Sequence, residues 1–209
     1  MANTTLYGTP VSTYVRTVRL LLAEANVNHK VVDVGIFNGD NETDEYLSKQ
    51  PFGKVPTIEI DGTKIYETAA ITHYLNQAAG DKYRPSDLLA QARMYQIISI
   101  IDNYLYGNAI GTIVIQRLIM PQQGSKPNEQ AVKEAIAPTQ KALEAIEALC
   151  VGAPFLLGTL ITLADFYLVP IFVYLSKTPE FGTVTTQTPK LMAWWQQVQD
   201  LESVKQVCA

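Results

Sequence analysis

The sequence predicts an α/β domain followed by an all-helical domain, and three observations lead to this prediction. Strand and helix patterns alternate over the first ~80 residues. The segment AAGDKYRPSD at 78–87 is polar and carries Gly and Pro, as linkers often do. Helical periodicity dominates everything after it. We therefore expect domains at residues 1–79 and 88–209, joined by a linker at 80–87.

The first domain is expected to follow the order β-α-β-α-β-β-α. In chain order, its elements are a strand at 4–7, a helix at 13–25, a strand at 30–34, a short helix at 43–48, strands at 57–60 and 63–66, and a helix at 68–78. The first three elements form a βαβ unit, whose right-handed crossover gives two parallel strands. Asp61-Gly62 is a hairpin signal, so the last two strands should pair antiparallel at the other edge.

The second domain is expected to consist of helices. Helical patterns cover 88–119, 128–150, 162–175 and 189–198. Gly107 and Gly111 are weak points in the first stretch, and Pro138 should kink or split the second. Thr162 and Asp165 have the spacing of a capping box, so we expect both to be structural.

Two adjacent tryptophans, Trp194 and Trp195, lie on the last predicted helix. We expect one of them in the core and the other at an interface or on the surface. Neither is assigned to substrate binding.

Composition excludes several classes of protein. The chain has 209 residues, 47% of them hydrophobic, and a net charge of -4 with no basic block, which argues against nucleic acid or an acidic membrane surface as partner. No apolar run reaches transmembrane length, and the N-terminus lacks the features of a signal peptide. Cys150 and Cys208 form no disulfide framework, which favours the cytoplasm. His29 and His73 lie far apart, so no metal site is expected.

Ser12 lies where the first strand leads into the first helix. In one interpretation, Ser12 or Thr13 simply caps that helix. In the other, the hydroxyl of Ser12 donates a hydrogen bond to a thiolate, because a helix N-terminus lowers the pKa of a thiol placed there. A hydrolase nucleophile is not expected, since no histidine is near in sequence and the G-x-S-x-G motif is absent.

Pro56 stands at the start of a predicted strand, where proline cannot donate to the ladder. A cis peptide bond between Val55 and Pro56 would turn the N–H and C=O of Val55 outward, where an extended peptide can pair with them. Thr68 opens the next helix and can cap it, while the free N–H groups there can bind a carboxylate. An ordinary turn and an ordinary cap explain each signal alone. Their order favours a bound peptide with its thiol at Ser12.

Motifs spread along the chain resemble those of cytosolic glutathione S-transferases. They are PVSTYVR at 10–16, PFGKVP at 51–56, ETAAI at 67–71, LITLADF at 160–166 and PKLMAWW at 189–195. The resemblance runs from about residue 4 to 200 and is greatest to the serine-type, phi-like branch. It implies a thioredoxin-like first domain, a helical second domain, a catalytic Ser12 and a homodimer.

The resemblance also implies a set of glutathione-binding residues. These are Asn41, Lys54, Val55, Pro56, Glu67 and Thr68. Phi-like enzymes usually carry a histidine and a lysine where this chain has Asn41 and Glu42, and a carboxylate there would repel the glycine carboxylate of glutathione. Lys54 can restore the positive charge through a charge-assisted hydrogen bond. Tyr7 is the alternative partner for the thiolate, as in tyrosine-type enzymes, but the phrase Pro-Val-Ser at 10–12 favours serine.

The expected function is therefore that of a glutathione transferase, which conjugates glutathione to small hydrophobic electrophiles in detoxification and can also reduce organic hydroperoxides. Glutathione is the co-substrate, and no cofactor is expected. Tyr104, Tyr106 and Ile110 are the candidate electrophile pocket. Asn41-Glu42 keeps open an alternative, a non-catalytic binding or regulatory protein of the same fold. A third class, an interaction module, is disfavoured because the chain ends soon after its last predicted helix.

Overall fold

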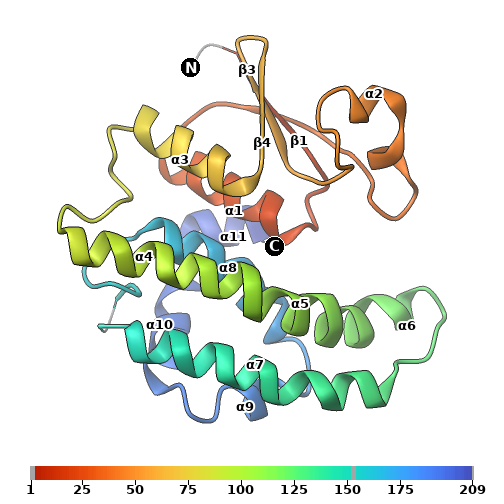
Figure 1. Ribbon diagram of the computed structural model, residues 1–209, viewed down its shortest axis with the longest axis vertical. Helices are drawn as coiled ribbons and strands as arrows, with labels where there is room; N and C mark the ends of the chain where they lie inside the picture. The colour runs from red at the N-terminus through yellow and green to blue at the C-terminus, as the bar shows by residue number, and fades with distance from the viewer. Residues whose placement is uncertain (1–2, 152–153, 209) are drawn as a thin grey trace. The chain divides into compact units, whose positions relative to one another are not determined.

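The structure is a computed structural model that describes residues 3–151 and 154–208. The chain forms two compact units (Figure 1), of which the first comprises Met1–Lys82 with Gln206–Ala209 and the second comprises Tyr83–Lys205. The division between Lys82 and Tyr83 falls inside the segment expected to be a linker. The prediction counted the last residues with the second domain, whereas here they group with the first.

The first unit contains a mixed sheet. Its elements are β1 (Thr4–Tyr7), α1 (Thr13–Glu24), β2 (Lys30–Val32), η1 (Asp40–Glu42), α2 (Asp44–Leu47), β3 (Thr57–Ile60), β4 (Thr63–Tyr66) and α3 (Thr68–Ala78). Within the described residues the sheet has four strands in the order β2-β1-β3-β4. β1 and β2 are parallel, and β3 pairs antiparallel with both β1 and β4. The predicted order, the βαβ unit and the edge hairpin are all confirmed.

Helices α1 and α3 pack against each other beside the sheet (Figure 1). Val15, Val18 and Leu22 form an apolar stripe on α1 and are almost completely buried. Leu6 and Ile58, on the paired strands β1 and β3, have no exposed surface. Each such side chain contributes roughly 1.5–3 kcal/mol when it leaves water. This core fixes the strands and therefore the loops that leave their ends.

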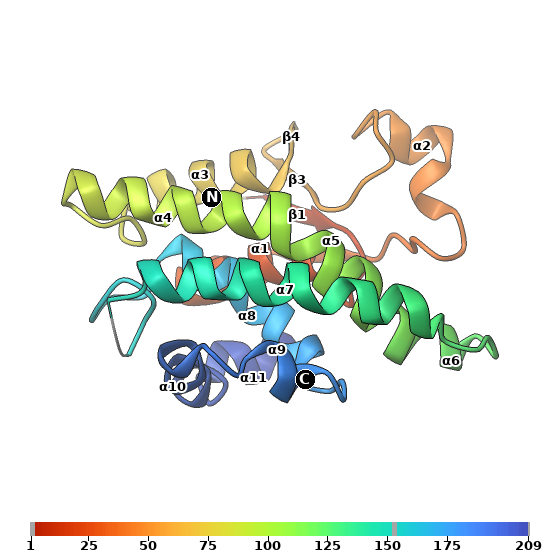
Figure 2. The ribbon, with the colours of Figure 1, turned by 60° about the horizontal axis from the view of Figure 1, so that its bottom comes forward.

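The second unit is built from helices. They are α4 (Leu88–Ile100), η2 (Ile101–Leu105), α5 (Tyr106–Asn108), η3 (Ala109–Ile119), α6 (Met120–Gln122), α7 (Glu129–Leu149), α8 (Leu163–Leu175), α9 (Phe181–Val184) and α10 (Pro189–Val198), followed by α11 (Glu202–Cys208), whose residues from Gln206 on are grouped with the first unit. The segments from α4 to α6 follow one another without a gap (Figure 2), and η2 and η3 have the wider π-helical winding. Gly107 and Gly111 therefore do not interrupt the helix, and the hydroxyl of Thr112 donates to the carbonyl of Gly107 at 3.2 Å.

Pro138 was predicted to kink or to split the second helical stretch, and it does not split it, because α7 continues through Pro138. Proline removes the N–H that would donate to the carbonyl of Glu134. Glu134 and Pro138 are both exposed, so water can bind that carbonyl. The next turn is held in addition by the hydroxyl of Thr139, which donates to the carbonyl of Ala135 at 2.7 Å.

The capping box at the start of α8 is confirmed and forms the centre of a buried network. One carboxylate oxygen of Asp165 accepts from the backbone N–H and the hydroxyl of Thr162, both at 2.8 Å. The other accepts from the backbone N–H of Leu156 at 2.9 Å and from the indole N–H of Trp194 at 2.8 Å. Burial raises the pKa of the Asp165 carboxyl, and these four donors oppose that effect.

The two tryptophans differ from the prediction, because both are buried. Trp194 is 2% exposed and Trp195 is 8% exposed. Both rings pack on Phe172, with centroid distances of 5.2 Å and 5.7 Å. The bond from Trp194 to Asp165 fixes one ring, and Phe172 brings the second ring into the same core.

Cys150 and Cys208 are both buried, and they form no disulfide. Burial raises the pKa of the Cys150 thiol to about 12, so this thiol stays protonated near neutral pH. None of the helices in the described parts of the chain is long and apolar enough to cross a membrane.

Candidate functional site

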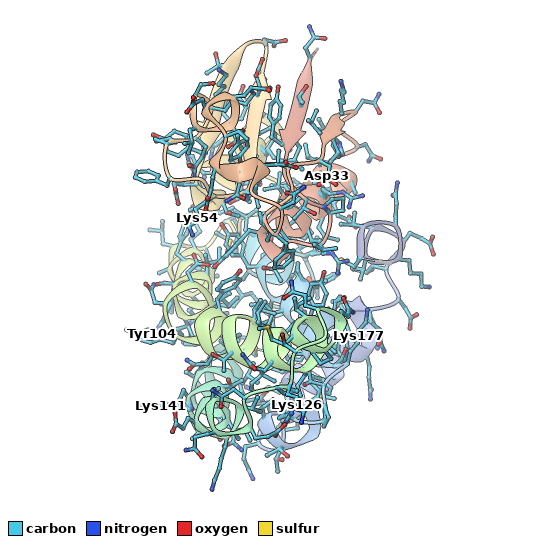
Figure 3. The ribbon with its side chains drawn as sticks, turned by 90° about the vertical axis from the view of Figure 1, so that its right-hand side faces the viewer. Asp33, Lys54, Tyr104, Lys126, Lys141 and Lys177 are labelled. Carbon is cyan, nitrogen blue, oxygen red and sulfur yellow. The ribbon has the colours of Figure 1, made fainter. Side chains whose placement is uncertain are left out.

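The strand register brings three predicted site segments to one end of the sheet. Tyr7, the last residue of β1, pairs with both Val32 and Thr57, and Thr57 pairs with Tyr66 at the end of β4. The segment that leads to Ser12, the Val55-Pro56 pair and the start of α3 therefore all leave the sheet at this end. Figure 3 shows Asp33, which follows β2, and Lys54, which precedes β3, at the same end.

Gly8 allows two of these segments to approach closely. Its φ is +152°, and a Cβ built on it would lie 2.5 Å from Cγ2 of Val15 and 3.2 Å from Cβ of Val55. Any larger residue would push the start of α1 away from the segment that carries Val55. The glycine thus holds the Ser12 loop and the Val55 loop beside each other.

Ser12 is the N-cap residue of α1, and its hydroxyl oxygen accepts from the backbone N–H of Val15 at 3.4 Å. A hydroxyl carries one proton and two acceptor lone pairs. Within the described residues the proton of Ser12 has no acceptor. Ser12 therefore caps the helix, and this cap leaves its proton available for an anion at the helix start, so the two interpretations are compatible.

The loop before Ser12 is held by Arg16, whose Nε donates to the carbonyl of Pro10 at 2.9 Å. Arg16 is only 6% exposed although it carries a full charge. Its side chain links the loop to α1, the helix that Ser12 caps. The position of Ser12 is therefore fixed by the Arg16 bond to the preceding loop and by its own bond to Val15 in the helix.

Tyr7, the alternative partner for a thiolate, is already engaged elsewhere. Its hydroxyl donates to the carboxylate of Glu59 at 3.3 Å. Burial and the neighbouring Glu59 raise the pKa of the Tyr7 phenol. A carboxylate next to the phenol would also repel a thiolate, so this arrangement favours Ser12.

The peptide bond between Val55 and Pro56 is cis, as predicted. Val55 is half-buried, and its backbone N–H and C=O have no hydrogen-bond partner within the described residues. Paired backbone groups are the rule in folded proteins. This edge can therefore accept an extended peptide, as a sheet edge accepts an added strand.

The start of α3 corrects one prediction. Glu67 is the N-cap residue, and Thr68 is the first helical residue, so Thr68 does not cap the helix. Its backbone is already helical, whereas a capping side chain comes from the flanking residue. Among the residues that the structure describes, no side chain caps this helix. The first N–H groups of α3 are therefore open to a ligand carboxylate.

Glu67 has φ 69° and ψ 117°, a conformation that non-glycine residues rarely adopt. Such a backbone costs roughly 1–3 kcal/mol and is concentrated at ligand-binding positions. The strained Glu67 thus marks the same helix start as a candidate site.

Asn41 and Lys54 differ in whether their side chains are already bonded within the protein. The side-chain amide of Asn41 donates to the carbonyl of Gly53 at 2.8 Å, and its Oδ1 is buried without a hydrogen-bond partner in the described residues. The side chain of Lys54 is exposed (Figure 3), and within the described residues its ammonium has no acidic partner. The structure therefore brings an unpaired cation to the site, whereas Asn41 is occupied in holding a loop.

Two family models match the chain, the glutathione S-transferase N-terminal domain over residues 6–83 and the glutathione S-transferase C-terminal domain over residues 68–202. The chain belongs to the glutathione S-transferase family.

Three plant proteins are among those to which this glutathione S-transferase is similar. Glutathione S-transferase F13 of Arabidopsis thaliana is 32% identical over 91% of this chain and 88% of its own length. The crystal structure of glutathione transferase F7 from Populus trichocarpa matches with a TM-score of 0.84 at 30% identity and covers 98% and 97% of the two chains. Glutathione S-transferase I from maize, solved in complex with an atrazine glutathione conjugate, matches with a TM-score of 0.85 at 27% identity over 99% and 97%. The phi-like assignment and the thioredoxin-like first unit are confirmed.

The residues predicted to line the electrophile pocket of this transferase belong to the second unit. Tyr106 and Ile110 lie one turn apart on the same helix, and Ile110 is 8% exposed. Tyr104 is 65% exposed and extends away from the helix (Figure 3). The pocket role of these three residues stays a prediction.

Sequence reasoning missed two residues that shape the site, Arg16 and Tyr46. Arg16 lies within a recognised motif, but charge alone does not indicate that a side chain returns to a loop carbonyl. Tyr46 occupies an apolar position of a short helix, where a core phenylalanine would give the same pattern. In the structure its hydroxyl donates to the carbonyl of Lys54 at 2.6 Å.

Proposed function

We propose that this glutathione transferase uses Ser12 to hold the thiol of bound glutathione as a thiolate, which then attacks an electrophile. The hydroxyl of Ser12 stands at the positive end of α1 with its proton unused, and this observation carries the proposal. The thiol proton leaves to solvent. The sulfur lone pair forms a carbon–sulfur bond, and the leaving group departs, or an addition product takes up a proton.

The proposed binding mode follows from the other segments. The N–H and C=O of Val55 pair with the main chain of the tripeptide, beside Pro56. The start of α3 at Glu67 and Thr68 receives the glutamyl carboxylate through its free N–H groups. Lys54 attracts the glycine carboxylate. The unpaired groups of Val55 and the uncapped α3 support this arrangement.

We propose small hydrophobic electrophiles as the second substrate, with Tyr104, Tyr106 and Ile110 as contacts. The maize relative in complex with an atrazine glutathione conjugate supports this class of substrate. The proposed reaction uses glutathione as co-substrate and no cofactor, and its setting is detoxification. The two buried cysteines, which form no disulfide, support a cytoplasmic location, since thiols stay reduced there.

A homodimer is also proposed. Phe52 is 66% exposed and stacks edge-to-face on Tyr66, with the ring centroids 6.2 Å apart. An exposed aromatic pair of this kind is typical of residues that anchor protein interfaces. Sedimentation equilibrium should give twice the chain mass of 23.1 kDa. A single-chain mass at micromolar concentration would contradict the proposal.

The thiol pKa of bound glutathione tests the proposed function directly. Ultraviolet thiolate absorbance of the wild-type complex, titrated with pH, should give an apparent pKa of about 6.5, compared with about 8.5 for a free thiol. Conjugation of a chlorinated nitrobenzene should rise with pH over the same range. If glutathione binds with an unshifted thiol and no electrophile is turned over, the non-catalytic binding protein becomes the better description.

A further inference from the structure

Tyr46 of α2 connects the two sides of the Val55-Pro56 pair. The side chain is 4% exposed, and its hydroxyl lies 2.6 Å from the carbonyl oxygen of Lys54 and 3.1 Å from the hydroxyl of Thr57. Lys54 precedes the pair, and Thr57 follows it as the first residue of β3. The buried hydroxyl oxygen of Tyr46 therefore contacts the residues on both sides of Val55-Pro56, the pair proposed to bind the main chain of glutathione.

The directions of these two hydrogen bonds follow from the inventory of protons. A carbonyl oxygen can only accept, so Tyr46 donates its single proton to Lys54. Thr57 must then be the donor to the oxygen of Tyr46. Burial raises the pKa of the Tyr46 phenol, so the proton stays in place near neutral pH. Because Thr57 is anchored in the sheet by its pairing with Tyr7 and Tyr66, the carbonyl of Lys54 is fixed relative to the sheet.

Asn41 fixes the preceding carbonyl in the same way, through its bond to Gly53 at 2.8 Å. Gly53 has φ +60°, and a Cβ built there would lie 3.1 Å from the backbone oxygen of Asn41. The two segments are thus in close contact. Two consecutive carbonyls, those of Gly53 and Lys54, are bound by side chains from 41–46, whereas the polar groups of Val55 remain unpaired.

We propose that Tyr46, assisted by Asn41, is a positioning residue for glutathione binding. Tyr46 acts through the carbonyl of Lys54 and thereby sets the main chain of Val55 and the ammonium of Lys54. Asn41 then contributes through Gly53 and not by direct contact with the ligand. The inference rests on the proposed function, because it assumes that Val55 and Lys54 receive glutathione.

Tyr46→Phe tests this inference, because it removes one oxygen and keeps the ring. The Kd and the KM for glutathione should rise about 5- to 10-fold, since the carbonyl of Lys54 loses its partner and the loop relaxes. The kcat at saturating glutathione and the pKa of the bound thiol should stay within about twofold and about 0.3 of the wild-type values. Titration calorimetry, steady-state kinetics and thiolate absorbance measure these quantities.

The matched control is Tyr74→Phe, the same chemical change on the exposed face of α3, where Tyr74 is 40% exposed. It should leave the Kd unchanged. Asn41→Ala provides a second test of the inference should Tyr46→Phe fold poorly, and its Kd should also rise.

γ-Glutamylcysteine, which lacks the glycine carboxylate, distinguishes an effect on the ammonium of Lys54 from an effect on the main chain of Val55. If the main effect of Tyr46 is to place the ammonium of Lys54, Tyr46→Phe should lose less affinity for this peptide than for glutathione. If its main effect is to place the main chain of Val55, the loss should be the same for both.

The outcomes distinguish this inference from the proposed function. If wild-type protein does not bind glutathione or does not shift its thiol pKa, the proposed function fails before any variant is compared. If the wild type behaves as proposed and Tyr46→Phe keeps its Kd, Tyr46 is a structural residue and the inference is wrong. A fall in kcat with a raised thiol pKa would also overturn it, since Tyr46 would then act through Ser12.

Discussion

Replacing Ser12 with alanine is expected to lower kcat/KM for conjugation by about 100- to 1000-fold, the usual loss when one hydrogen-bond donor to an anion is removed from an active site. The pKa of bound glutathione should return to about 8.5, the value of a free thiol. The KM for glutathione should change by less than about threefold, because the tripeptide is held by Val55, Lys54 and the start of α3. Steady-state kinetics and thiolate absorbance provide both measurements.

Two further variants make the Ser12 experiment decisive. Ser12→Thr keeps a hydroxyl at the helix start and should retain part of the activity. Tyr7→Phe removes the competing hydroxyl, which is bonded to Glu59, and should leave the thiol pKa unchanged. The opposite pattern, with a large loss in Tyr7→Phe and none in Ser12→Ala, would identify a tyrosine-type enzyme. Loss of the Ser12 cap should also cost about 1 kcal/mol of stability, so unfolding curves must accompany the kinetics.

Much of the first unit could be predicted from the sequence because its signals are local. The hairpin at Asp61-Gly62 and the apolar stripe of α1 each depend on neighbours within a few residues. The sequence left open whether Pro138 kinks or splits its helix, because the effect of a proline depends on what replaces its lost hydrogen bond. Here Glu134, whose carbonyl loses its donor, is an exposed residue, and the hydroxyl of Thr139 adds a bond to the carbonyl of Ala135. Neither fact is contained in the helical pattern.

The sequence predicted which segments form the candidate site better than it predicted the hydrogen bonds that their residues make. Ser12 and Val55 follow from a helix start and an X-Pro bond, which are visible in sequence. The cap at α3 was assigned one residue too late, since the choice between Glu67 and Thr68 depends on a backbone angle. The prediction that Asn41 binds glutathione stays a prediction, but the bond from its amide to Gly53, a contact across 12 residues, could not be foreseen. Such contacts arise only when the chain has folded.

The most destabilising single substitution in the second unit should be Asp165→Ala. The carboxylate has no exposed surface and accepts four hydrogen bonds, so its removal leaves four donors without an acceptor. At roughly 1 kcal/mol for each orphaned donor, the free energy of unfolding should fall by about 4 kcal/mol. Asp165→Asn should recover little, because its amide group turns two N–H bonds toward groups that are themselves donors.

Urea unfolding measures this loss, and an exposed cap of the same type provides the reference. Asp87 caps α4 by accepting from the N–H of Ala90 at 2.8 Å in an exposed position, so Asp87→Ala should cost only about 1 kcal/mol. Both tryptophans lie in the second unit, so their fluorescence reports its unfolding. Circular dichroism provides an independent measurement, because loss of the Trp194 hydrogen bond can itself change the fluorescence of the folded protein. Equal losses for Asp165→Ala and Asp87→Ala would mean that water replaces the carboxylate at little cost. A much larger loss of stability for Asp165→Ala would mean that water cannot reach the four donors and replace the carboxylate. The stability of the helical unit then depends on this one buried side chain.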